Sequence, residues 1–149
     1  MRAVVQRVSR SKVSVDEKLI GEIGVGLLVL LGVTDADDNK DADYLLEKIV
    51  NMRIFDDADG KMNLSLADID GEMLVVSQFT LYGDTRRGRR PSFIKAAAGD
   101  EALRWYKYFV ARSREKVKKV STGEFGAMMD VELVNDGPVT IILDSEKSI

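Results

Sequence analysis

Residues 25–33, VGLLVLLGV, form an unbroken apolar run of strand length. Such a run predicts a strand that is buried on both faces of a sheet. Before it, residues 4–8 alternate in polarity and Val13 and Val15 continue the pattern, which indicates a period-two strand. Residues 20–24 predict a short strand and a turn between these two segments. The chain therefore opens with three strands.

Two amphipathic helices are predicted from the spacing of apolar residues further along the chain. Residues 35–39 offer N-cap side chains before the first helix. The second helix is predicted from about Asp100, and its far end is basic, which suits a helix C-terminus. The apolar positions are Ala42, Leu45, Leu46, Ile49 and Met52 in the first helix, and Ala102, Trp105, Tyr106, Phe109, Val110 and Val117 in the second.

The remaining segments predict further strands. A buried strand at residues 73–76 runs into the polar residues that follow it. The tail predicts two strands, at 128–134 and 139–143, with a break between them. We therefore expect one α+β domain over residues 1–149, with a mostly antiparallel or mixed sheet and two main helices on one side.

Histidine and cysteine are both absent from the 149 residues. Their absence excludes Ser-His-Asp and Cys-His catalysis, disulfides and a Cys/His zinc site. We expect no metal and no other cofactor. The net charge of −3 argues against non-specific coating of nucleic acid, although a local basic patch is compatible with it.

Membrane and export signals are also missing from the sequence. The N-terminal residues contain no apolar signal-peptide core, and residues 25–33 are too few to span a bilayer. The lack of cysteine suits a reducing compartment. We therefore expect a cytoplasmic protein with no membrane partner.

The first candidate site is SQFTL, residues 77–81, which follows directly on a buried strand. Hydroxyls, an amide and backbone N–H groups at a strand end can converge on a ligand and stabilise an oxyanion. A strand edge whose hydroxyls bond to neighbouring backbone is the plainer interpretation of the same residues. Thr80 could act as a nucleophile only with a base, and the motif contains no histidine, lysine or carboxylate.

Two further motifs are candidates for function. In NDGPVT, residues 135–140, a Gly-Pro pair interrupts an apolar stretch, and general statistics favour a trans bond and a turn there. The other is an arginine-rich loop at residues 83–92. Guanidinium groups can bind phosphate through two parallel hydrogen bonds, so the loop is a candidate phosphate contact. A solvated loop without a ligand is an equal alternative. Its cationic side chains are Arg86, Arg87, Arg89 and Arg90.

Taken together, these residues resemble the D-aminoacyl-tRNA deacylase family nearly end to end. The resemblance rests on MRAVVQRV at 1–8, SQFTL at 77–81, GEFGAMM at 123–129 and NDGPVT at 135–140. Two separated motifs in the right order, over the right length, make it specific. Asp136 occupies a position that varies in the family, so it is no departure from the pattern.

The resemblance implies a homodimeric editing hydrolase with a barrel-like sheet. It implies cleavage of the ester of D-aminoacyl-tRNA, and of glycyl-tRNA(Ala), releasing the free amino acid and tRNA and sparing L-aminoacyl-tRNA. The ribose 2′-hydroxyl of the terminal adenosine would help to activate water, and backbone N–H groups near Phe79 would stabilise the developing charge. The implied catalytic residues are Ser77, Gln78, Phe79 and Thr80, with Thr80 in a positioning role.

The resemblance also implies how chirality is selected. The Gly-Pro bond is cis in the family, and the carbonyls of Gly137 and Pro138 would enter the partner subunit's site and fill the space that an L side chain needs. The resemblance also implies residues that hold the Gly-Pro loop in place and residues that line a pocket for the terminal adenosine. The implied loop supports are Arg7, Asn135 and Thr140, and the implied pocket residues are Phe125 and Met129.

Two hypotheses about function follow from the sequence. The first is an esterase that acts on D-aminoacyl-tRNA and glycyl-tRNA(Ala). The second is a non-catalytic RNA-binding module that uses the arginine-rich loop and the basic helix end, with Arg86, Arg87, Arg89 and Arg90 as phosphate contacts. The second predicts salt-dependent RNA binding without cleavage of the ester.

Overall fold

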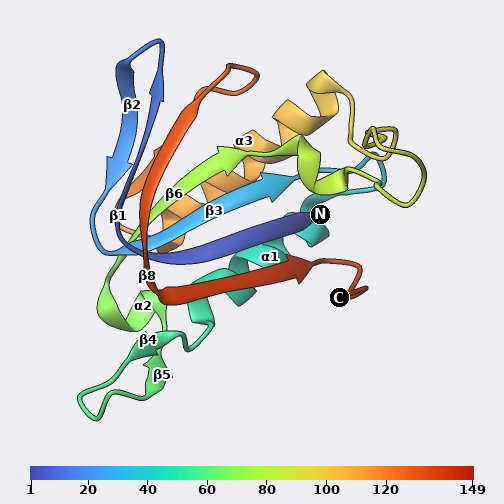
Figure 1. The fold of residues 1–149 in the computed structure, drawn as a ribbon. Coiled ribbons are helices and arrows are strands. Elements are labelled where there is room, and N and C mark those ends of the chain that lie inside the picture. The colour runs from blue at the N-terminus through green and yellow to red at the C-terminus, as the bar shows by residue number, and fades with distance from the viewer.

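A long first strand, β1 (Arg2–Val15), organises the computed structural model, which describes residues 1–149 (Figure 1). It pairs antiparallel with β2 (Lys18–Ile23), β3 (Gly26–Gly32) and β8 (Asp130–Asp144). The first half of β1 pairs with β3 and the second half with β2, while β8 follows its other edge. Most of the sheet is therefore antiparallel.

The sheet continues beyond β3 through two parallel pairings. β3 pairs with β6 (Glu72–Ser77), and β6 pairs with β7 (Val120–Thr122). β7 then comes close to β2, where the Ser121 hydroxyl donates to the Glu22 carbonyl at 3.0 Å. The mixed sheet thus curls into a nearly closed barrel, which confirms the expected α+β, barrel-like fold class.

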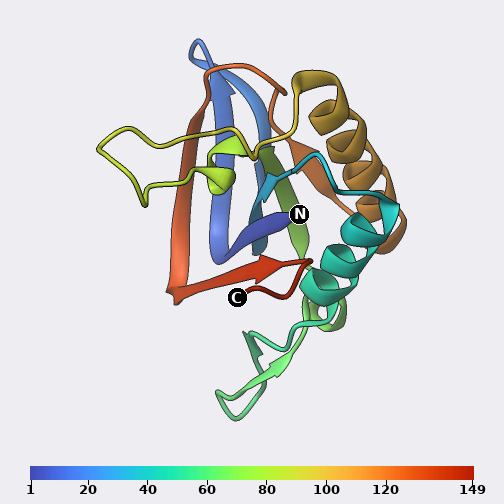
Figure 2. The ribbon, with the colours of Figure 1, turned by 90° about the vertical axis from the view of Figure 1, so that its right-hand side faces the viewer.

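The two main helices, α1 (Asn39–Asn51) and α3 (Gly99–Lys116), cover the same side of the sheet (Figure 2). α1 begins where the sequence predicts, because Asp38 accepts from the Lys40 N–H and Asp41 accepts from the Asp38 N–H. None of the helices has the length and apolar character that a membrane crossing requires. The remaining elements are β4 (Phe55–Asp56), β5 (Met62–Leu64), α2 (Leu66–Ile69) and the 3₁₀ turn η1 (Phe79–Tyr82).

Apolar side chains form two cores, one on each face of β3. Leu27 and Val29 belong to the larger core, between the sheet and the helices. Leu28 points to the opposite face and belongs to the smaller core inside the curled sheet, together with Leu74 and Val76. This arrangement confirms the prediction that the apolar run is buried on both faces.

The C-terminal strand differs from the sequence prediction. The tail is one strand, β8, rather than two strands separated by a turn. Gln6 pairs with Thr140, and Val8 pairs with Asn135. Between these two pairs the chain advances five residues along β8 but only two along β1. β8 therefore contains a bulge of three extra residues. The Gly137–Pro138 bond within this bulge is cis, not trans as general statistics favour. β7, only three residues long, was not predicted.

Asp144 fastens the end of β8 to the start of the chain. Its carboxylate accepts hydrogen bonds from Arg2 Nε at 3.3 Å, the Ser148 hydroxyl at 2.5 Å and the Glu146 N–H at 2.9 Å. Burial opposes ionisation of this carboxyl group, but the hydrogen bonds together outweigh burial. The pKa of Asp144 therefore lies below its ordinary value.

We expect Asp144→Asn to lower the free energy of unfolding by about 1–3 kcal/mol at pH 7, because charged hydrogen bonds are lost. A carboxyl group with a lowered folded pKa stabilises the fold above its unfolded pKa, and this contribution is lost as pH falls through the folded pKa. The difference from wild type should therefore shrink as the pH falls below about 4. Urea unfolding at pH 7 and pH 3 measures it, with the exposed Glu132→Gln as control. An equal difference at both pH values would contradict the assignment.

Candidate functional site

A cavity of about 590 Å³ opens at the carboxyl end of β6. β3 and β6 are parallel, so both end at this edge, and the chain leaves β6 through η1. Residues 77–80 form one wall of the cavity, the residues around the start of α3 form another, and residues 125–129 close it. The first sequence motif and the GEFGAMM motif, far apart in the chain, therefore meet at one place.

The cavity is uncharged. Its lining contains no aspartate, glutamate, lysine or arginine, and its polar side chains are those of Ser77, Gln78 and Thr80. The Gln78 amide donates a hydrogen bond to Thr80 Oγ1. No lining side chain can therefore take a proton from the Thr80 hydroxyl. Elsewhere in the chain, carboxylates do not gather in a metal-binding group of three or more.

Backbone N–H groups gather where β6 gives way to η1. The Gln78 N–H is bonded to the Leu31 carbonyl at 2.8 Å, which fixes the end of the strand. The first hydrogen bond of η1 runs from the Leu81 N–H to the Gln78 carbonyl at 3.2 Å. The N–H groups of Phe79 and Thr80 precede it and have no acceptor within η1. They are the donors at this turn that a ligand oxygen could use.

Phe125 and Met129 line the same cavity as the end of β6. The Phe125 ring packs against Tyr106, with 5.6 Å between ring centroids. Tyr106 is held in turn by its hydroxyl, which donates to the Val75 carbonyl at 2.8 Å. Burial raises the pKa of Tyr106 to about 12, so its phenol stays neutral. The cavity thus has an aromatic wall fixed from behind, as an adenosine pocket requires, and that role stays a prediction.

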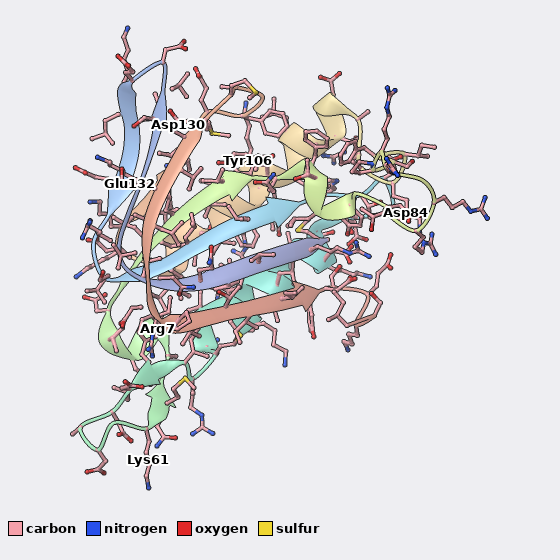
Figure 3. All side chains as sticks on the ribbon, in the orientation of Figure 1. Arg7, Lys61, Asp84, Tyr106, Asp130 and Glu132 are labelled. Carbon is pink, nitrogen blue, oxygen red and sulfur yellow. The ribbon has the colours of Figure 1, made fainter.

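Arg7 lies at the corner where β8 bends, well away from Tyr106 beside the cavity (Figure 3). Its side chain is buried, its Nε donates to the Asp136 carbonyl at 2.9 Å, and its Nη1 donates to the Ile54 carbonyl at 2.8 Å. These two bonds tie the bulge to the segment before β4. Arg7 therefore contacts the bulge directly, and its role as a loop support, which the resemblance implies, stays a prediction.

The neck of the bulge is closed by side-chain hydrogen bonds. Asn135 accepts from the Val139 N–H at 3.1 Å and donates to Thr140 Oγ1 at 3.0 Å. Gly137 has φ +135°, a conformation that favours glycine, and a Cβ there would lie 2.8 Å from a methyl group of Val139. Gly137 and Pro138 are exposed, and neither lines the cavity of its own chain.

The arginine-rich loop does not present four equivalent charges. Arg86 donates two hydrogen bonds to Asp84, at 2.9 and 2.5 Å, and this guanidinium holds the pKa of Asp84 well below its usual range. The other three, Arg87, Arg89 and Arg90, are exposed and have no carboxylate partner. At the base of the loop, Phe93 packs edge-to-face on Phe79, with centroids 5.1 Å apart. Three free cations therefore stand on a loop that is anchored to the cavity wall.

Comparison with known proteins assigns the chain to a family. The family model described as D-Tyr-tRNA(Tyr) deacylase matches residues 4–144. The chain belongs to this family. D-aminoacyl-tRNA deacylases of Clostridioides difficile (strain 630) and Thermosipho africanus (strain TCF52B) are 63% and 60% identical to it over 148 and 147 residues, and each alignment covers 99% of both chains. The resemblance inferred from the sequence is therefore confirmed.

Two solved structures share the fold of this chain. A structure of a c-Myc DNA Unwinding Element Binding Protein is 41% identical, with a TM-score of 0.92 over 97% of this chain and 98% of that one. A structure of a probable eukaryotic D-amino acid tRNA deacylase is only 18% identical but shares the fold, with a TM-score of 0.82 over 95% of this chain and 97% of that one. The deacylase fold thus persists at low sequence identity.

Part of the cavity lining in this deacylase-family chain carries no functional signal that the sequence pattern revealed. Ala97, Gly99 and Ala102, around the start of α3, line the cavity, but the sequence predicted only a packing role for Ala102 and none for the other two. Ala97 and Gly99 belong to a run of small residues, 96–99, at the start of the helix, whose side chains cannot fill the space beside η1. The contact of Phe93 with Phe79 had no local signal, because it joins two segments across the loop.

Proposed function

We propose that this chain hydrolyses the ester of D-aminoacyl-tRNA, releasing a free D-amino acid and tRNA, and that it spares L-aminoacyl-tRNA. The observation that carries the proposal is the meeting of residues 77–80 with Phe125 and Met129 around one uncharged cavity. The relatives at about 60% identity are named for this activity. The proposed compartment is the cytoplasm, where aminoacyl-tRNA is used.

Glycyl-tRNA(Ala) is a second proposed substrate of the same site. Exclusion by bulk discriminates against a side chain in the L position. Glycine has no side chain, so a site of this kind does not reject it. Clearance of glycine therefore follows from the same geometry as clearance of D-amino acids.

The proposed mechanism relies on the substrate and the backbone. With no ionisable side chain in the lining, the ribose 2′-hydroxyl of the terminal adenosine helps to activate water. Water attacks the ester carbonyl carbon, the bond to the ribose oxygen breaks, and that oxygen leaves with a proton. The N–H groups of Phe79 and Thr80 stabilise the negative charge that develops on the carbonyl oxygen, and one such donor is worth about 3–4 kcal/mol.

The proposed chirality filter requires a second copy of the chain. Gly137 and Pro138 are exposed and follow Asp136, whose carbonyl accepts a hydrogen bond from Arg7, yet they lie outside the cavity of their own chain. In a homodimer, the bulge of one protomer enters the cavity of its partner. The carbonyls of Gly137 and Pro138 then occupy the space that an L side chain needs.

Matched D- and L-aminoacyl-tRNA, incubated with the wild-type protein, test the activity directly. We expect rapid loss of the D ester and of the glycyl ester, and little loss of the L ester beyond spontaneous hydrolysis. Binding of tRNA without cleavage of any ester would instead support the RNA-binding module. Equal cleavage of D and L esters would contradict the chirality filter.

Thr80→Ala is expected to keep activity within about tenfold of wild type, because removal of a true nucleophile costs on the order of 10⁴-fold or more. The reason is that Thr80 has no base in the cavity and bonds to Gln78. Single-turnover rates with saturating D-aminoacyl-tRNA measure the effect, with Ser77→Ala as a parallel variant. A Thr80 variant that binds substrate but does not turn over would overturn the proposed mechanism.

Arg7→Gln is expected to loosen the bulge and so relax chirality, because the Asp136 and Ile54 carbonyls lose their donors. We expect the rate on L-aminoacyl-tRNA to rise about tenfold or more, equivalent to about 1.4 kcal/mol of discrimination, with the D rate nearly unchanged. The exposed Arg10→Gln is the matched control. Equal falls in the D and L rates would indicate general damage to the fold and not a role in selection.

A further inference from the structure

A second hollow adjoins the candidate site. It lies between α3 and β7, has a volume of about 430 Å³, and shares Phe125 with the first cavity. Phe125 is held against Tyr106, which is anchored to Val75 on β6. One fixed ring thus forms a wall of both hollows. The second hollow, here called the α3–β7 groove, therefore adjoins the first cavity at this ring.

The charges on α3 are distributed unevenly with respect to the α3–β7 groove. Of its five cationic residues, three have carboxylate partners: Arg104 pairs with Glu101, Arg112 with Asp43 and Glu115, and Lys116 with Glu47. The other two, Lys107 and Arg114, make no ion pair and both line the groove, which contains no carboxylate. The groove therefore has an uncompensated positive charge.

The spacing of these two cations suits a chain that carries repeated negative charges. Lys107 and Arg114 are seven residues apart, so they share one face of the helix at a separation of roughly 10 Å along its axis. Ala111 and Thr122 lie in the same groove, and their small side chains leave room for a backbone. The apolar Leu103 and the exposed part of Phe125 offer surfaces for bases or sugars.

We propose that the α3–β7 groove binds the single-stranded nucleotides that precede the terminal adenosine of tRNA, with Lys107 and Arg114 contacting their phosphates. This inference rests on the proposed function, which places the terminal adenosine against Phe125 in the first cavity. No residue of the arginine-rich loop lines the α3–β7 groove. The groove therefore supplies a separate contact to the substrate, one nucleotide or more beyond the ester.

Two substrates separate the groove from the site of chemistry. One is D-aminoacyl-tRNA, and the other is D-aminoacyl-adenosine, which carries the same ester but no phosphate. For the double variant Lys107→Gln/Arg114→Gln, we expect kcat/KM on the tRNA substrate to fall about tenfold, mainly through KM. The slope of log(kcat/KM) against log[salt] should become shallower by about 1.4, because each phosphate contact to a single strand contributes about 0.7. The value on D-aminoacyl-adenosine should not change.

A matched control removes the same charge from the same helix. Arg104→Gln/Lys116→Gln takes away two cations that are already paired with carboxylates outside the groove, and it should leave both substrates nearly unaffected. The groove assignment would be overturned if the two double variants lost kcat/KM equally on the tRNA substrate. It would also be overturned if the groove variant lost kcat/KM equally on the tRNA substrate and on D-aminoacyl-adenosine. If the wild-type protein cleaved neither ester, the proposed function would fail, and this inference would fail with it.

Discussion

The structure depends on the fact that β1 has only two hydrogen-bonding edges and that both are used. β3 and then β2 take one edge, and β8 takes the other from Arg2 to Ser14. The sheet extends from β1 through β3, which pairs in parallel with β6. That parallel pairing brings two strand ends to one edge of the sheet, and the cavity opens there. The location of the cavity thus follows from the pairing of β1 with β3 and of β3 with β6.

Features set by neighbouring residues could be predicted from the sequence. The apolar run of β3, the Asp38 cap of α1 and the basic end of α3 all depend on patterns within a few residues. β7 and the bulge of β8 depend instead on partners far along the chain, because Val120 pairs with Met73 and Asn135 pairs with Val8. Alternating polarity indicates which face of a strand is buried, but it does not identify the distant strand with which it pairs. The Gly-Pro motif was therefore interpreted as a turn between strands.

The site shows the same division between local and distant information. Residues 77–80 could be singled out from their place after a buried strand, but the sequence pattern favoured an ordinary strand edge. The decisive fact is that residues 125–129 close the space in front of them. The arginines of the loop look alike in sequence, yet Asp84 neutralises Arg86 and leaves the others free. Counting all four arginines therefore overestimates the positive charge that the loop can present to an anion.

The bulge of β8 also bears on the solubility of the chain. β8 pairs only with β1, so its outer edge is open along a strand of 15 residues. A long open edge is a template on which another chain can add a strand and begin to aggregate. The bulge interrupts that edge near its middle, and Pro138 has no N–H to offer there. The segment proposed to reject L-amino acids therefore also blocks edge-to-edge extension of the sheet.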